Sequence, residues 1–269
     1  MVIVHDCVYL AHLFALRCLP AHTPAIVVKH TGQVRFASRA GSLLFSLLNR
    51  YIFPCFLRKA RVLVFVTQSK RDSFPAVPDV ASEVIVNGID TTLFAPSGAV
   101  RDGSLLFVGR FVDKKGIQIV KEMARLMPQR RFTLAGFGPT DPRDWGLPNV
   151  ECHWGPDAEA IAALYCRAAA VILPSETEGT PLVALEALAC ETPVVIGETG
   201  TAPDRALARQ LALLPVDIDN PVQTAQLWAA RLESAIARST PDRNVIVASH
   251  STRKMAGAYR NLIARLEEL

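Results

Sequence analysis

The stretch that decides the fold is VILPSETEGTPLVALEALACETPVVIGETG, from Val171 to Gly200. Val171–Leu173 is a short apolar run ended by a proline, which predicts a buried parallel strand. Thr180 and Pro181 are typical of a helix start, because a hydroxyl can cap free N–H groups and a proline there sacrifices no needed donor. Leucines mark the apolar face of that helix, and Pro193–Ile196 is predicted as the next buried strand. The stretch therefore predicts a strand, a loop, a helix and a strand.

Two carboxylates flank the start of the predicted helix. Glu178 lies in the loop before it, and Glu186 lies about a turn and a half inside it. Free N–H groups at a helix start carry roughly half a positive charge, which suits a diphosphate. A carboxylate accepts two hydrogen bonds from neighbouring hydroxyls, as on a ribose. The pair therefore predicts a site for a phosphorylated, hydroxyl-rich molecule. The alternative for these two residues alone is a loop acid and a solvated helix residue.

The segment EGTPLVALE, from Glu178 to Glu186, and the ALACETPVV that follows it closely resemble the signature of family 4 glycosyltransferases of the GT-B fold. The resemblance continues upstream through LLFVGRFVDKKG and VNGID and covers residues 84–200 well. It implies an α/β protein with two Rossmann-like, doubly wound domains. It also implies transfer of a sugar from a nucleotide-sugar donor with retention of the anomeric configuration.

The resemblance assigns catalytic roles to four residues. Arg110 and Lys115 match the residues that hold the donor diphosphate and stabilise it as the leaving group. Glu178 is expected near the donor sugar, where its charge orients a hydroxyl and favours positive charge at the anomeric carbon. His5 resembles a histidine that touches the acceptor or the sugar.

Further residues are expected to bind the donor. Glu186 is expected to accept the ribose hydroxyls, and backbone N–H groups near the helix start are expected to contact the sugar. The glycine turn GFGP resembles the loop near the nucleotide base, and Trp154 either touches the base or packs in the core. The donor-binding set is Gly109, Arg110, Lys115, Gly138, Gly179, Thr180, Pro181, Leu182 and Glu186. No acidic metal motif of the D-x-D type is recognised among the predicted donor-binding residues, so no metal and no cofactor are expected.

Charge is unevenly spread along the 269 residues. Residues 1–100 hold 10 Lys and Arg against 5 Asp and Glu, although the net charge of the whole chain is only +4. No basic tract or nucleic-acid motif is present, so this half suits an anionic membrane surface or acceptor better than DNA. Arg35–Arg61 interleaves aromatic and basic residues. It is interpreted either as an interfacial, lipid-touching surface or as aromatic core residues with solvated arginines.

Six cysteines form no C-x-x-C pair and are interpreted as reduced core residues of a cytoplasmic protein. No signal peptide is evident. In the resembling family a glycine-rich turn and several strands precede the segment that matches Val2–Asp6. Met1 is therefore expected to be a late start or a truncation, which leaves the N-terminal domain incomplete.

Residues 1–95 are expected to form this partial, acceptor-side domain. Residues 96–250 are expected to form the nucleotide-sugar domain, and 251–269 a helix that crosses back to the first domain. Two functions stay open: a retaining transferase acting on a glycan or lipid-linked acceptor in polysaccharide, glycolipid or envelope glycan synthesis, and a truncated module that binds a sugar nucleotide without transferring it. A phosphorylase or epimerase of the same fold ranks last, because no lysine motif for pyridoxal phosphate is seen.

Overall fold

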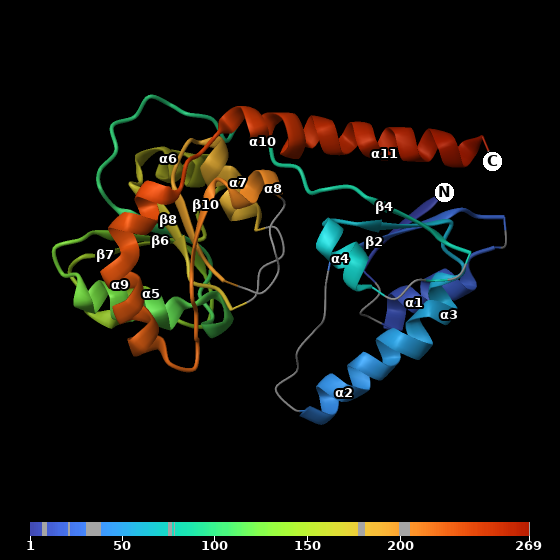
Figure 1. Ribbon diagram of the computed structural model, residues 1–269, viewed down its shortest axis with the longest axis horizontal. Coiled ribbons are helices and arrows are strands. Elements are labelled where there is room, and N and C mark those ends of the chain that lie inside the picture. The colour runs from blue at the N-terminus through green and yellow to red at the C-terminus, as the bar shows by residue number, and fades with distance from the viewer. Residues whose placement is uncertain are drawn as a thin grey trace. The chain divides into compact units, whose positions relative to one another are not determined.

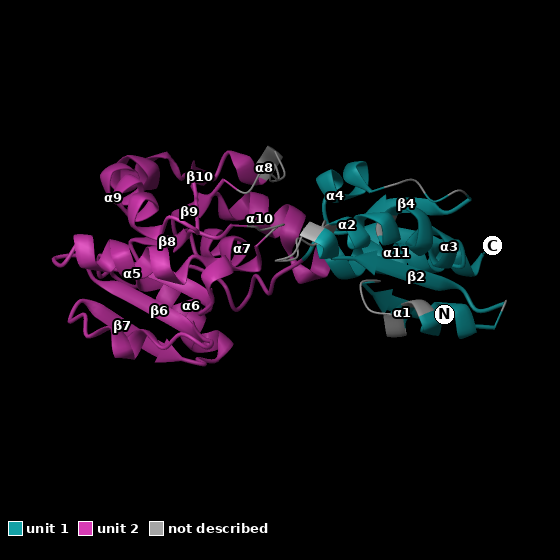
Figure 2. Ribbon diagram, turned by 90° about the horizontal axis from the view of Figure 1, so that it is seen from below, with its two compact units in different colours: residues 1–87, 255–269 teal, residues 88–254 magenta. Residues whose placement is uncertain are grey.

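The computed structural model describes residues 1–6, 10–20, 22–30, 39–74, 77, 79–176, 181–198 and 205–268. The chain divides into two compact units, coloured separately in Figure 2. Unit 1 comprises Met1–Asn87 and Met255–Leu269, and unit 2 comprises Gly88–Lys254. Each unit is built on one parallel sheet (Figure 1). The expected α/β class with two parallel-sheet domains is therefore confirmed.

Unit 1 has a four-stranded sheet in the order β1-β2-β3-β4, with every neighbouring pair parallel. Its strands are β1 (Val2–His5), β2 (Ala25–Lys29), β3 (Val62–Phe65) and β4 (Ala81–Val84). All five residues of β2 are buried, as expected for a parallel strand that is covered on both faces.

The two faces of this sheet are covered by different helices. Ala25 and Val27 pack on one side with Leu16 of α1 and Leu57 of α3. On the other side, β2 and β3 pack against Leu262 of the C-terminal helix α11, which Figure 2 shows lying across the strands. The helices of unit 1 are α1 (Leu10–Cys18), α2 (Arg39–Leu47), the π-helical η1 (Leu48–Ile52), α3 (Phe53–Leu57), α4 (Gln68–Ser73) and α11 (Thr252–Glu267).

The segment from α2 to α3 resolves the two interpretations of Arg35–Arg61 only in part. Phe45 and Phe53 are buried in the core, whereas Tyr51 is 60% exposed. Phe36 lies outside the described residues. No helix among the described residues is both long enough and apolar enough to cross a bilayer.

Unit 2 has a six-stranded parallel sheet in the order β10-β9-β8-β5-β6-β7. Its strands are β5 (Leu105–Arg110), β6 (Phe132–Phe137), β7 (Val150–Trp154), β8 (Ala170–Leu173), β9 (Val194–Gly197) and β10 (Leu211–Leu214). The chain runs outward from β5 through β6 to β7, and then returns to the other side of β5 through β8. The strand order therefore reverses between β5 and β8.

Two helical layers cover the sheet of unit 2. Helices α5 (Ile117–Leu126) and α9 (Pro221–Arg238) pack on one face, and α6 (Ala158–Arg167), α7 (Leu182–Ala189) and α10 (Arg243–His250) pack on the other. The unit also contains α8 (Arg205–Ala208) and two 3-10 turns, η2 (Asp113–Lys115) and η3 (Pro142–Trp145).

Local sequence explains where several helices begin. The side chain of Asp157 accepts a hydrogen bond of 2.8 Å from the backbone N–H of Ala160, as a helix cap does. Asn220 directly precedes α9, but its side chain donates to Asp217 at 2.7 Å and makes no cap bond. Pro221 alone marks that start, because its missing N–H is not needed there.

The interpretation of the cysteines as core residues is only partly right. Cys166 and Cys190 are buried, whereas Cys18 and Cys55 are exposed. The five described cysteines are all free thiols. Cys7 lies outside the described residues.

Candidate functional site

A small cavity of about 90 Å³ lies where the strand order of unit 2 reverses. Ligands of open parallel sheets bind outside the carboxyl ends of the strands at this switch point. Phe107, Val108 and Gly109 of β5 and Leu173 of β8 form one side of the cavity, and Lys115, Ser175, Pro181, Leu182 and Val183 form the rest. Four predicted donor-binding residues are therefore brought together: Gly109, Lys115, Pro181 and Leu182.

The turn after β5 places Lys115 at the cavity. Gly116 adopts φ 77° directly after η2, a conformation that a residue with a Cβ rarely takes. The N–H of Lys115 donates to the carbonyl of Val112 at 2.9 Å, and the N–H of Gly116 donates to that of Asp113 at 2.7 Å. Lys114 is exposed and Lys115 is half-buried, so adjacent lysines have different surroundings.

Arg110 is the last residue of β5 and directly follows Gly109. Its side chain is exposed, and it does not itself line the cavity. A guanidinium here stands at the carboxyl end of the central strand with its planar donors open to a ligand. Of the two predicted cations, Lys115 of η2 lines the cavity, whereas Arg110 follows the cavity residue Gly109 without lining the cavity itself.

Ser175 was not predicted as a site residue. It is 1% exposed, and within the described residues its hydroxyl has no hydrogen-bond partner. A buried hydroxyl left unpaired costs free energy unless a ligand or water satisfies it. The only sequence signal was its place directly after the proline that ends β8.

Helix α7 starts at the cavity. Pro181 precedes it, and Leu182 and Val183 are its first residues. The first N–H groups of a helix have no acceptor within the helix, which makes them a site for an anion. Glu186 lies four residues after Leu182, so the two share one face of the helix.

The carboxylate of Glu186 is held by a tyrosine from the neighbouring helix. The hydroxyl of Tyr165 in α6 donates to Oε2 of Glu186 at 2.9 Å. Burial raises the pKa of Glu186, and the hydrogen bond from Tyr165 partly opposes this rise. Glu186 is thus not the solvated helix residue of the alternative interpretation.

Exposed aromatic side chains lie at the carboxyl ends of β6 and β7. Phe137 is 56% exposed and Trp154 is 44% exposed, so Trp154 is not the packed core tryptophan that the sequence left open. The guanidinium of Arg143 lies 4.9 Å from the centre of the Trp154 ring. Gly138 follows Phe137, and a Cβ there would lie 2.5 Å from the carbonyl oxygen of Phe111. The glycine is therefore required for the two loops to approach.

His5, the remaining predicted catalytic residue, belongs to unit 1. Its Nδ1 lies 2.8 Å from Nε2 of His30, and the two rings stack with centres 5.1 Å apart. The buried Lys29 faces Asp6 at 3.5 Å beside them. Burial lowers the pKa of His30, against the opposing charge of Asp6. The histidine pair and the Lys29–Asp6 pair thus share the carboxyl ends of β1 and β2.

Three predicted site residues, Glu178, Gly179 and Thr180, lie outside the described residues. Among the described residues, no three His, Cys, Asp or Glu side chains converge as a metal site would require.

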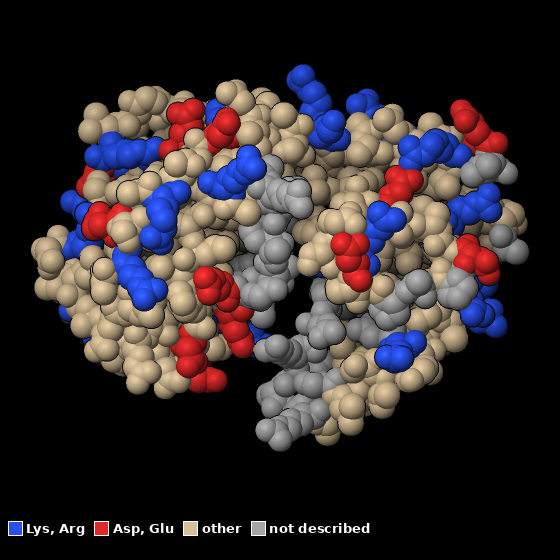
Figure 3. Space-filling model, viewed as in Figure 1, with Lys and Arg blue, Asp and Glu red and all other residues tan. Residues whose placement is uncertain are grey.

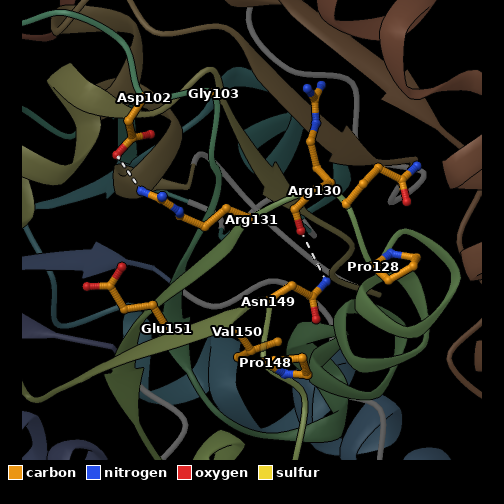
Figure 4. Close-up of a pocket in the computed structure, with 10 residues that line it drawn as sticks. Asp102, Gly103, Pro128, Arg130, Arg131, Pro148, Asn149, Val150 and Glu151 are labelled. Carbon is orange, nitrogen blue, oxygen red and sulfur yellow. Dashed lines mark hydrogen bonds and ion pairs between the residues drawn. The ribbon is translucent and has the colours of Figure 1, made fainter.

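A larger cavity of about 710 Å³ lies at the opposite, amino ends of β5, β6 and β7 (Figure 4). Its charged side chains take part in ion pairs, several of them with residues that do not line the cavity. Asp102 lies 3.9 Å from Arg131 and 3.4 Å from Arg167, and Arg130 pairs with Glu233. None of the described site residues lines this cavity. The small cavity at the switch point is therefore the candidate site.

Comparison with known sequences identifies related proteins. The family model described as glycosyl transferases group 1 matches residues 102–230. The GDP-mannose-dependent alpha-(1-6)-phosphatidylinositol monomannoside mannosyltransferase of Mycolicibacterium smegmatis is 31% identical over 179 residues, which are 55% of this chain and 47% of the relative. The D-inositol 3-phosphate glycosyltransferase of Frankia alni is 34% identical over 159 residues, 48% of this chain and 39% of the relative. The chain thus spans less than half the length of these curated relatives.

Solved structures share the fold. The sucrose-phosphate synthase of Thermosynechococcus elongatus superposes with a TM-score of 0.73 at 20% identity, covering 99% of this chain and 74% of that one. The HepE protein of Anabaena, solved with UDP and glucose, gives a TM-score of 0.69 at 16% identity, covering 99% and 78%. The chain is therefore related in sequence, over residues 102–230, to the group 1 glycosyl transferases, and it has the two-domain α/β fold of the GT-B glycosyltransferases.

Proposed function

We propose that the protein is a glycosyltransferase that moves a sugar from a nucleoside diphosphate sugar to a hydroxyl acceptor with retention of configuration. One observation carries the proposal: the switch-point cavity joins Lys115, the start of α7 and the buried hydroxyl of Ser175, which has no hydrogen-bond partner among the described residues. A cation, a hydroxyl donor and free helix N–H groups are the partners that a diphosphate needs.

The donor occupies this site through its diphosphate and its ribose. Lys115 and Arg110 contact the diphosphate and stabilise the charge that develops on it as the bond to the anomeric carbon breaks. Glu186, one turn further along α7, accepts the ribose hydroxyls. The base lies toward Gly138 and the exposed ring of Trp154, where stacking is available. Glu178, Gly179 and Thr180 complete the sugar end.

The acceptor is a glycan or a lipid-linked glycan of polysaccharide, glycolipid or cell-envelope synthesis, bound with the help of His5. The relatives named above support such acceptors, because one acts on a phosphatidylinositol mannoside. Leaving-group charge is met by Arg110, Lys115 and backbone amides and not by a metal. Transfer that survives a chelator supports this assignment, and loss of transfer restored by a divalent cation contradicts it.

We place this activity in the cytoplasm, in peripheral contact with an anionic membrane. Leu43, Leu44, Leu47 and Tyr51 form an exposed apolar face on α2 and η1, and each is between 47% and 63% exposed. No acidic residue occurs from 39 to 61, whereas Arg50, Arg58, Lys59 and Arg61 do. Elsewhere, charges of both signs are interspersed over the face that Figure 3 shows. An apolar helix face with only cationic neighbours suits the surface of an anionic bilayer.

A second candidate is a module that binds a sugar nucleotide without transferring it. It is favoured by the confinement of the cavity and of Glu186 to unit 2. Calorimetry with UDP, GDP and ADP, beside a transfer assay with the corresponding sugar donors, separates the two functions. Binding with transfer, and an unchanged anomeric configuration in the product by NMR, supports the enzyme. Binding without transfer to any glycan or glycolipid acceptor supports the module, and absence of binding rejects both.

A further inference from the structure

A buried tyrosine is hydrogen-bonded to the carboxylate that we assign to the ribose. Tyr165 is 0% exposed, and its hydroxyl donates to Oε2 of Glu186 at 2.9 Å. Burial raises the pKa of the Tyr165 hydroxyl well above its ordinary value, and the charge of Glu186 adds to the rise. The hydroxyl therefore keeps its proton throughout the physiological range and acts only as a donor to Glu186.

The position of Tyr165 is fixed from two sides. Its ring meets that of Phe94 edge-on, with centres 6.0 Å apart. Its carbonyl accepts a hydrogen bond of 2.7 Å from the hydroxyl of Thr192, which in turn accepts one of 3.0 Å from Arg101. A side chain held in this way directs its hydroxyl without further loss of conformational entropy when a ligand binds.

The two carboxylate oxygens of Glu186 have different surroundings. Oε2 is occupied by Tyr165, whereas within the described residues Oε1 takes part in no hydrogen bond. Glu186 does not itself line the cavity, but it lies one turn after Leu182, which does, on the same face of α7. One oxygen is therefore anchored by Tyr165, and the other has no hydrogen bond of this kind among the described residues.

We infer that Tyr165 is a positioning residue for the ribose, which orients Glu186 through Oε2 and thereby makes the site select ribonucleotides over 2′-deoxyribonucleotides. The inference rests on the proposed function. The hydroxyl also favours the ionised form of Glu186, because a donor stabilises the negative charge. Removing it raises the pKa of Glu186 further, and acid then weakens nucleotide binding at a higher pH.

The test uses Tyr165→Phe in the full chain, with UDP, GDP and ADP and their 2′-deoxy counterparts as probes in calorimetry. We expect the variant to bind the preferred ribonucleotide about tenfold more weakly, the scale of one hydrogen bond to a charged group. Affinity for the deoxy form is expected to change little, so selectivity falls. The loss of nucleotide affinity at acidic pH is expected to set in at a higher pH in the variant than in the wild-type protein. Tyr259→Phe, a half-buried tyrosine of unit 1, is the matched control and is expected to change neither.

A double-variant cycle separates positioning from a packing defect. In a Glu186→Gln background, Tyr165→Phe is expected to cause no further loss of selectivity. If Tyr165→Phe weakens the binding of ribonucleotides and 2′-deoxyribonucleotides equally, the role of Tyr165 is overturned while the proposed function stands. The same holds if the pH at which acid weakens nucleotide binding does not change. If the wild-type chain binds none of the three ribonucleotides, the proposed function fails, and this inference fails with it.

Discussion

Gly116 packs directly against the backbone of Pro174: a Cβ on Gly116 would lie 2.1 Å from the carbonyl oxygen of Pro174. This contact joins the turn after β5 to the loop after β8, and the N–H of Glu176 donates to the carbonyl of Lys114 at 3.1 Å beside it. Lys115 and Ser175 reach the cavity from these two segments. The geometry of the candidate site therefore depends on a glycine that touches no ligand in our proposal.

Gly116→Ala is expected to lower the free energy of unfolding by on the order of 3 kcal/mol, because it adds a clash to a left-handed backbone. It is also expected to weaken nucleotide binding by displacing Lys115. Chemical denaturation and calorimetry measure the two effects. Gly257→Ala in α11 is the matched control, since an added Cβ there meets nothing within 4 Å. That change is expected to stabilise the protein by about 0.5–1 kcal/mol. A Gly116→Ala protein with wild-type stability and binding would contradict this account.

Lys115→Ala is expected to reduce kcat/KM for transfer by roughly a hundredfold, the scale on which one electrostatic contact to a transition state acts. Lys114→Ala is the control, because this neighbour has the same charge but is exposed and does not line the cavity. Steady-state kinetics with the preferred donor compare the two variants. Equal losses in both would show that general positive charge, and not a placed contact, supports the reaction.

Sequence alone predicted the elements that have strong local signals. The strand, helix and strand predicted between Val171 and Gly200 correspond to β8, α7 and β9, whose apolar runs are bounded by prolines. Strand β10 was missed, since Leu211–Leu214 is only four residues of uninterrupted apolar sequence, which also occurs in buried helices. Helix α10 was missed because its β-branched residues weaken the helical pattern.

Of the candidate site, sequence predicted the parts that lie on one loop or one helix. The pairing of His5 with His30 joins residues 25 apart, and that of Tyr165 with Glu186 joins residues 21 apart. Each pair forms because neighbouring elements pack together, so no local sequence pattern predicts it. Ser175 was missed for the same reason, because its burial depends on the loop that meets it from β5.

The apolar face of α2 and η1 predicts binding to anionic vesicles. We expect the protein to sediment with phosphatidylglycerol-containing vesicles more than with pure phosphatidylcholine, and less at high salt, because the cationic neighbours are screened. A Leu43→Glu, Leu47→Glu double variant is expected to lose this binding. Val222→Glu, at a similarly exposed apolar position of α9, controls for added negative charge. Equal sedimentation with both lipids would contradict the proposed contact.

Glu186→Gln is expected to stabilise the ligand-free protein at neutral pH while weakening nucleotide binding. Because the folded pKa of Glu186 is raised above the unfolded value of 4.5, the native state holds a proton that the unfolded state has released. The wild-type protein therefore loses stability as the pH rises from 4.5 through the raised pKa of the folded state. Gln carries no charge and avoids that loss.

Thermal unfolding of the two proteins from pH 4 to pH 8 measures this linkage. The advantage of Glu186→Gln is expected to be full above the raised pKa, to shrink as the pH falls through it, and to vanish below about 4.5. Glu198→Gln, an exposed carboxylate of the same unit, reports what the loss of a surface charge does by itself. A Glu186→Gln protein that is less stable than wild type at pH 7 would show that the ionised carboxylate is a net stabilising group. In that case the ionised carboxylate of Glu186 would not lower the stability of the ligand-free protein, and the proposed trade of stability for ligand binding would be wrong.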